Sequence, residues 1–137
     1  MKVYHGTDED SAKNLIKNIQ VKKGGGELGR GFYTGENIAL AAALAFGKFG
    51  PSGKVLSLDI NDHHFVGLNI RVLTKRKVVY EHWKHLIFKK ESHRFTFGQD
   101  VICGPFATIE FSYQYKFESE KSEDVLNDHS IKEILGT

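Results

Sequence analysis

The pattern of hydrophobic and polar residues in the first part of the chain predicts a short strand followed by an amphipathic helix. Residues 2–4 carry Val and Tyr and predict the strand. Thr7 and Asp8 can cap the helix, and Asp10 stands three residues after Thr7, as in a weak capping box. The helix should end before Gly24 and bury one face, because hydrophobic residues recur at spacings of three and four: Ala12, Leu15, Ile16 and Ile19.

Two further helices are predicted downstream. Residues 38–46 are apolar on nearly all sides, so the helix predicted over 37–46 should be largely buried, and Gly47, Gly50 and Pro51 stop it. A third helix is predicted over 78–90. Its buried face should carry Val79, Trp83, Leu86 and Ile87.

The remaining segments predict short strands and irregular connections. Strands are expected over residues 31–34, 54–60, 100–103 and 114–119, and another within 65–72. Residues 61–71 and 106–113 are ambiguous, 94–97 predict a loop or an edge strand, and the charged tail predicts short helices near 123–126 and 131–135. Because repeated βαβ units do not emerge, short strands with about three helices predict the α+β class.

Length and composition restrict the classes of protein to consider. The 137 residues predict a single domain over 1–137, and a net charge of +2 is too small to indicate nucleic-acid binding by itself. Cys103 is the only cysteine, so no internal disulfide can form, which fits a reducing compartment. No run of about 18 apolar residues occurs, and the first residues are too polar for a signal peptide. We therefore expect a cytoplasmic protein with no membrane partner.

A glycine-rich run, Gly24 to Tyr33, is the most unusual stretch of the sequence. Five glycines lie within ten residues, and an aromatic pair ends the run. A flexible linker is one interpretation. A tight glycine turn that fixes Tyr33 in the wall of a binding site is the other. A literal G-x-G-x-x-G occurs here, but the dinucleotide-fold motif needs a strand before it and a helix after it, and the predicted order is the reverse.

Other reactive side chains give weaker indications. His82 and His85 are three residues apart on a predicted helix, and His63 and His64 are adjacent, yet no carboxylate is suitably spaced and no metal is expected. Cys103 lies in an apolar run, which is typical of a buried, unreactive thiol.

Two short stretches together indicate a binding site for a nicotinamide riboside. His5-Gly6-Thr7 follows the first predicted strand, so an imidazole that can bind a hydroxyl lies next to bare backbone that can bind an amide. The ring of Tyr33 can stack on a flat ring and binds a cationic ring more strongly. The order and separation of the two stretches make the pair more specific than either alone.

On these residues the sequence resembles the ADP-ribosyltransferase superfamily, in the branch of diphtheria toxin and the poly(ADP-ribose) polymerases. Tyr4-His5-Gly6-Thr7 resembles the first motif of that branch, and Gly29-Arg-Gly-Phe-Tyr33 resembles the second. A small bacterial branch is still more similar. Its members also share a Trp-bearing helix, an Asp-Val/Ile-Val/Ile-x-Gly-Pro-x-Ala segment and a strand that opens with Gln, which correspond here to Trp83, residues 100–107 and Gln114.

The resemblance implies a fold, a site and a reaction. The fold would be a split β-sandwich of short strands with flanking helices. His5, Tyr33 and Gln114 would be catalytic, and NAD, used as a co-substrate, would be bound by His5, Gly6, Thr7, Gly29, Arg30, Gly31, Tyr33 and Phe46. The third position is usually Glu, which contacts a ribose hydroxyl and favours an oxocarbenium-like transition state, whereas Gln brings no charge. Glu110, Glu118 and Glu120 are the alternative carboxylates, and Glu118 ranks before Glu110.

The expected function is therefore NAD-dependent mono-ADP-ribosyl transfer to a macromolecular acceptor, which is a protein, DNA or RNA. Analogy with small stand-alone members suggests a bacterial toxin of a toxin–antitoxin or phage-defence pair, with an inhibitor protein as partner. NAD hydrolysis and non-catalytic binding of NAD or ADP-ribose are the alternatives. The basic patch Lys75-Arg-Lys77, the run Lys89-Lys90 and the pair His93-Arg94 would suit a phosphate backbone, although a solvated face is the preferred explanation.

Overall fold

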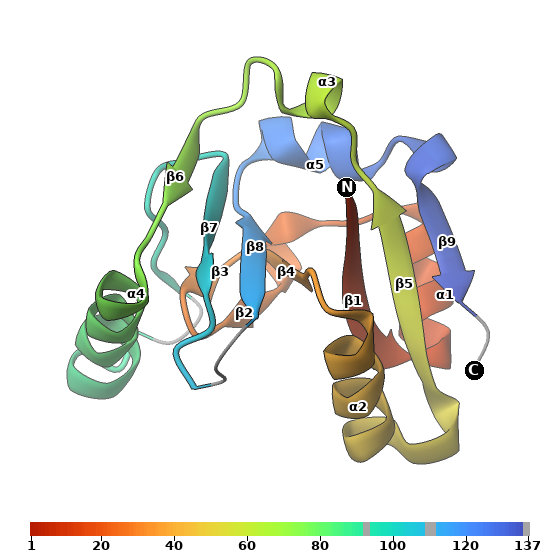
Figure 1. The fold of residues 1–137 in the computed structure, drawn as a ribbon, viewed down its shortest axis with the longest axis horizontal. Helices are drawn as coiled ribbons and strands as arrows, with labels where there is room; N and C mark the ends of the chain where they lie inside the picture. The colour runs from red at the N-terminus through yellow and green to blue at the C-terminus, as the bar shows by residue number, and fades with distance from the viewer. Residues whose placement is uncertain (92–93, 109–111, 136–137) are drawn as a thin grey trace. The chain divides into compact units, whose positions relative to one another are not determined.

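A computed structural model describes residues 1–91, 94–108 and 112–135 of the chain, and its class is α+β, as predicted (Figure 1). The chain divides into two compact units. The first contains Met1–Ile19, Thr34–Val66 and Asp124–Thr137, and the second contains Gln20–Tyr33 and Gly67–Glu123. Each unit therefore combines segments that lie far apart in the sequence.

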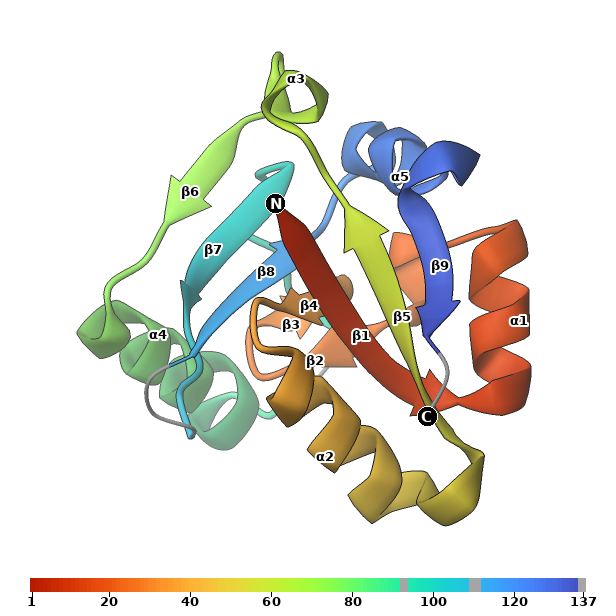
Figure 2. The ribbon, with the colours of Figure 1, turned by 45° about the vertical axis from the view of Figure 1, so that its right-hand side comes forward.

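The first unit is built on β1 (Lys2–Asp8) and β5 (Gly53–Asp59), which run antiparallel along their whole length (Figure 2). β9 (Lys132–Leu135) pairs with the other edge of β5, and Gly35, the last residue of β4 (Phe32–Gly35), pairs with Tyr4 of β1. β1 is longer than predicted, because β5 pairs with its second half. The helix predicted near 131–135 is wrong, since these residues instead complete the sheet at β5.

The helix α1 (Glu9–Lys17) begins at a clear cap. The Asp8 carboxylate accepts a hydrogen bond from the Ser11 N–H at 2.8 Å, so Asp8 rather than Thr7 is the N-cap. Asp8 satisfies the helix end alone, and the weak box through Asp10 is not used. Ile19 lies beyond the helix but is fully buried.

The helix α2 (Ile38–Phe49) contradicts the prediction that it is largely buried. Its buried residues are Ala41 and Ala45, whereas Ile38, Leu44 and Phe46 are exposed. A Cβ built on Gly6 would lie 2.5 Å from the Ala41 carbonyl oxygen, so Gly6 allows α2 to lie directly on β1. Only the narrow alanine face of the helix is needed for this contact, which leaves the larger side chains outside.

Short elements complete the first unit. They are the 3-10 turn η2 (Gly50–Ser52), the helix α3 (Asp62–Phe65), which the sequence did not predict, and the 3-10 turn η5 (His129–Ile131). The helix α5 (Glu120–Leu126) lies on the boundary between the units in the sequence.

The second unit contains β6 (Ile70–Val72), β7 (Val101–Pro105) and β8 (Tyr113–Phe117), with β7 in the middle (Figure 1). β6 and β7 are parallel, and β7 and β8 are antiparallel. The glycine-rich run forms a small hairpin of β2 (Gly25–Gly26) and β3 (Gly29–Arg30) after the 3-10 turn η1 (Val21–Lys23). A core of Leu28, Leu73, Val78 and Ile102 joins this hairpin to the strands.

The helix α4 (Lys75–His82) continues into a π-helical turn, η3 (Trp83–Phe88). Its predicted buried face is wrong. Val78 and Glu81 are buried, whereas Val79, Trp83 and Ile87 are exposed, and Leu86 is half-buried. The helix starts three residues earlier than predicted, because Thr74 caps it, and Val78 rather than Val79 enters the core. Across the described residues, no helix has the length and apolar character needed to cross a membrane.

Candidate functional site

The hairpin that precedes Tyr33 holds its ring in one place. The Tyr33 hydroxyl donates to the Gly29 carbonyl at 2.6 Å and accepts from the Leu28 N–H at 2.9 Å. A Cβ on Gly26 would lie within 3.0 Å of three ring carbons, so only glycine allows the backbone to lie on this ring. The glycine-rich run is therefore an ordered loop that positions Tyr33, and the linker interpretation is wrong.

The ionisation of Tyr33 is suppressed by its surroundings. Burial raises the pKa of its phenol far above the usual value. The N–H of Leu28 opposes this rise, and the negative charges of Glu27 and Glu118 add to it. The phenol therefore stays protonated, which it must do to donate to Gly29.

Gln114 on β8 is fully buried and is hydrogen-bonded to Glu27 of the hairpin. Its Nε2 donates to Glu27 Oε1 at 2.6 Å and to the Pro105 carbonyl at 3.2 Å. This fixes the amide orientation, because the flipped amide would direct its oxygen at two acceptors. Its Oε1 has no hydrogen-bond partner among the residues that the structure describes. A buried acceptor of this kind is costly, and it fits a site for a ligand that donates.

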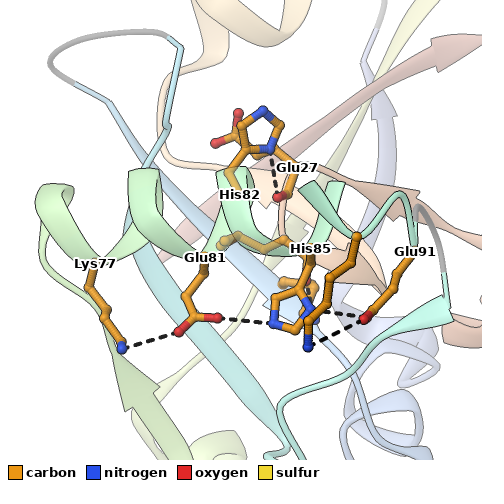
Figure 3. A network of polar contacts seen from close by, with 9 residues as sticks. Glu27, Lys77, Glu81, His82, His85 and Glu91 are labelled. Carbon is orange, nitrogen blue, oxygen red and sulfur yellow. Dashed lines mark hydrogen bonds and ion pairs between the residues drawn. The ribbon is translucent and has the colours of Figure 1, made fainter. Parts of the chain in front are cut away.

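Glu27 is the functional candidate that sequence reasoning missed. Its Oε1 also accepts from the Ala107 N–H at 2.5 Å, and its Oε2 lies 3.5 Å from the Thr108 hydroxyl. Its backbone carbonyl accepts from His82 Nδ1 at 2.9 Å (Figure 3), so this nitrogen carries a proton. Charged residues are rare in the glycine-rich run, where Glu27 and Arg30 alone are charged. The position of Glu27 within this run was the signal in the sequence that could have identified it as a candidate.

A buried ion pair lies on the same face of β8 as Gln114. Lys116 and Glu118 are 2.6 Å apart, and Lys116 is fully buried. Lys116 Nζ donates to the Leu28 carbonyl at 2.8 Å, and Glu118 Oε1 accepts from the Gly98 N–H at 2.7 Å. Burial lowers the pKa of the Lys116 ammonium, and the hydrogen bond and charge of Glu118 oppose that shift.

Glu118 therefore lies on the same face as Gln114, as the alternation of the strand predicted. The Glu118 carboxylate forms an ion pair with Lys116. Another alternative carboxylate, Glu110, lies outside the described residues. The structure thus brings together Gly29, Tyr33, Gln114 and Glu118, all in the second unit. Arg30 and Gly31 belong to the same hairpin region, and a Cβ on Gly31 would lie 2.6 Å from Lys116 Cγ.

The remaining predicted NAD-binding residues belong to the first unit. His5, Gly6 and Thr7 lie within β1, opposite Leu56, Val55 and Lys54 of β5, rather than after the end of a short strand. Phe46 is exposed on α2 and lines an apolar hollow of about 450 Å³. The hollow is also lined by Ile38, Ala42, Ala45, Pro51, Val55 and Leu135.

The histidines of α4 and η3 are used in polar contacts. His85 lies between the carboxylates of Glu81 and Glu91, at 3.1 and 3.0 Å (Figure 3). Within residues 1–91, 94–108 and 112–135, no group of three or more His, Cys, Asp or Glu is arranged to hold a metal ion. Cys103 is half-buried on β7.

Comparison with known proteins adds no relative to this geometry. No protein-family model matches the chain, and no curated protein is similar to it in sequence. The resemblance to ADP-ribosyltransferases therefore depends on the sequence motifs alone.

Proposed function

We propose that this protein is an NAD-dependent mono-ADP-ribosyltransferase in which Glu27, held by Gln114, supplies the catalytic carboxylate. One observation carries the proposal, namely the 2.6 Å hydrogen bond between Gln114 Nε2 and Glu27 Oε1. Glu27 is thereby hydrogen-bonded to Gln114, the residue that the resemblance aligns with the glutamate of the family. The family reaction needs a negative charge, and Gln114 by itself lacks it.

Glu27 and Gln114 have different roles in this proposal. Glu27 is half-buried, whereas Gln114 is fully buried. Gln114 is therefore a positioning residue, which with the Ala107 N–H orients Glu27. Glu27 would accept a hydrogen bond from the nicotinamide ribose and favour the positive charge that develops at its anomeric carbon.

The other residues take the parts that the resemblance implies. Tyr33, fixed by Gly29 and Leu28, would stack on nicotinamide. His5 would bind the adenine-side ribose, and the Gly6 backbone would bind the carboxamide. The bond between the anomeric carbon and the nicotinamide nitrogen breaks, nicotinamide leaves with the electron pair, and a nucleophilic atom of the acceptor bonds to that carbon and loses its proton.

The proposal also keeps the biological role that analogy suggests. A macromolecular acceptor fits a transferase, and an inhibitor protein fits a bacterial toxin of this size. Hydrolysis with water as acceptor uses the same carboxylate, so the acceptor assay decides between the two reactions. Labelled macromolecule indicates transfer, and free ADP-ribose indicates hydrolysis.

The test is nicotinamide release from NAD, measured by chromatography, together with a calorimetric NAD titration. Glu27→Gln keeps the shape and removes the charge, so we expect release to fall by about 10²–10³-fold with little change in NAD affinity. Glu9→Gln is the matched control, since Glu9 is an exposed carboxylate on α1, and it should release nicotinamide at the wild-type rate.

Gln114→Ala tests positioning. It should lower kcat and leave the affinity for NAD nearly unchanged, because Glu27 loses a hydrogen bond but keeps its carboxylate. Unchanged release in Glu27→Gln would remove Glu27 from the reaction. Saturable NAD binding by wild type without release, even with cell extract as a source of acceptors, would indicate a binding module.

A further inference from the structure

The helix formed by α4 and η3 exposes an aromatic face that the proposed active site does not use. Tyr80, Trp83 and Phe88 have 48%, 46% and 68% of their surface exposed. Val79 and Ile87 are exposed next to them. Large apolar side chains gathered in this way on one helix are typical of a surface that meets a partner.

The π-helical turn arranges two of these rings as a continuous platform. The Lys89 N–H donates to the Lys84 carbonyl at 3.0 Å, which is the five-residue spacing of a π-helix. This spacing aligns residues five apart, so the rings of Trp83 and Phe88 stack with centroids 5.2 Å apart and planes 25° apart. Tyr80 lies 6.3 Å from Trp83 and extends the platform. Turns of this kind occur frequently at functional sites.

The segment that carries the platform is rich in positive charge. Residues 75–91 contain six Lys and Arg against two Glu, a net charge of +4, whereas the whole chain carries +2. None of Arg76, Lys84 and Lys90 forms a salt bridge with a residue that the structure describes. These cations are therefore available to a polyanion.

The two glutamates of the segment are already neutralised on the inner side of the helix. Glu81 is buried and lies 3.1 Å from both Lys77 and His85, and Glu91 lies 3.0 Å from His85 (Figure 3). Burial opposes the ionisation of Glu81, but the hydrogen bond and charge of Lys77 prevail and lower its pKa. The two glutamates therefore pair with Lys77, Lys89 and His85, and they form no salt bridge with Arg76, Lys84 or Lys90.

We propose that this aromatic and basic face binds single-stranded nucleic acid, with bases stacked on Trp83, Phe88 and Tyr80 and phosphates paired with the lysines. Aromatic platforms flanked by cations are how proteins hold unpaired strands, because every base has a flat face to stack. A duplex hides those faces. The proposal also names single-stranded nucleic acid as the acceptor of ADP-ribose. The acceptor role rests on the proposed function, whereas the binding of nucleic acid does not.

The spacing of the charges favours this partner over an anionic membrane. Arg76 and Lys84 lie four residues before and after Tyr80, so they share its side of the helix. A helix that lies in a membrane interface keeps its basic residues on the polar side and inserts an unbroken apolar side. Here the inserted side would have to carry Arg76 and Lys84.

The probes are fluorescein-labelled oligonucleotides of about 20 nucleotides (single-stranded DNA, single-stranded RNA and a DNA duplex), measured by anisotropy at two salt concentrations. Wild type should bind both single strands and prefer them to the duplex. Trp83 is the only tryptophan, so its fluorescence should be quenched as bases stack on it. Trp83→Leu and Phe88→Ala should each weaken binding about 5- to 100-fold.

Matched variants separate stacking, charge and folding. Leu44→Ala removes an equally exposed apolar side chain on α2 and should leave oligonucleotide affinity unchanged. Lys84→Ala should reduce the slope of log affinity against log salt by about 0.7, whereas Lys48→Ala on α2 should not change it. Of the five substituted positions, Lys84 is half-buried and the other four are exposed, so thermal unfolding should be near wild type, and it is measured for each variant.

Contrary results distinguish failure of the surface from failure of the proposed function. Equal affinity for duplex and single strands would indicate charge alone, and a blue shift of Trp83 fluorescence with anionic lipid vesicles, without oligonucleotide binding, would indicate a membrane surface. Nicotinamide release without oligonucleotide binding would remove this acceptor and leave the transferase. Oligonucleotide binding without nicotinamide release in their presence would retain the surface and remove the proposed function.

Discussion

The strands β5 and β8 are both buried in their own units, but their interiors differ in kind. β5 buries Val55, Leu56 and Leu58, and it packs against apolar neighbours. β8 buries Gln114 and Lys116, with Glu118 following directly. Hydrophobic burial stabilises the first, whereas the second bears the desolvation of an ion pair and an amide. The buried amide and ion pair of β8 are costly for stability, and β8 is where the candidate site lies.

The largest expected effect comes from breaking the buried ion pair. Lys116→Ala should lower the free energy of unfolding by about 3–5 kcal/mol, because Glu118 is left buried without its cation. The double variant Lys116→Met/Glu118→Leu removes both charges and should unfold within about 1 kcal/mol of wild type or be more stable. Urea denaturation measures both. A double variant as unstable as the single one would show that the pair itself stabilises the fold.

The apolar strand provides the reference for this comparison. Leu58→Ala should destabilise by about 2–5 kcal/mol, because it leaves a cavity in a fully buried position. No second substitution should recover this lost stability, whereas in β8 the removal of both charges should recover the stability that Lys116→Ala loses. A loss below about 1 kcal/mol in the same urea experiment would mean that the first unit closes around the cavity.

A smaller effect is expected at the glycines. Gly31→Ala would place a methyl group 2.6 Å from the buried Lys116 side chain and 2.9 Å from the Phe117 carbonyl, so it should destabilise by about 1–3 kcal/mol. Gly47 on α2 has no heavy atom within 4 Å of a Cβ, and Gly47→Ala should stabilise by about 0.5–1 kcal/mol through helix propensity. Thermal unfolding of both variants should give shifts of opposite sign.

The smallest effect concerns an exposed carboxylate in the first unit. Hydrogen bonds from the Ser130 hydroxyl and N–H, and then from His64, lower the pKa of Asp128 to about 2. Its folded pKa lies below its unfolded value near 3.8, so its contribution is present above that value and is lost as pH falls through about 2. Asp128→Asn should flatten the dependence of stability on pH between about 4 and 2. An unchanged slope in acid unfolding would contradict this.

Local patterns were enough for the elements whose neighbours agree with them. The α+β class, the strand β5, the strand β7 and the capped helix α1 were predicted, because period and capping chemistry act over a few residues. The helix α2 and the face of α4 were wrong for one reason. Which face of a helix is buried depends on the residues that pack against it. Gly6 of β1, for example, packs against Ala41 of α2, and apolar periodicity within the helix cannot predict that contact.

The candidate site divides in the same way. The sequence alone shows that Tyr33 directly follows a glycine-rich run. This pattern is typical of a tight turn that fixes an aromatic ring, because glycine lets the backbone approach the ring closely. The sequence did not determine that Glu27 meets Gln114, because the two residues are 87 positions apart and no local rule acts over that separation. Only the tertiary structure placed the carboxylate there, by packing the hairpin against β8 through Leu28, Lys116 and the shared core.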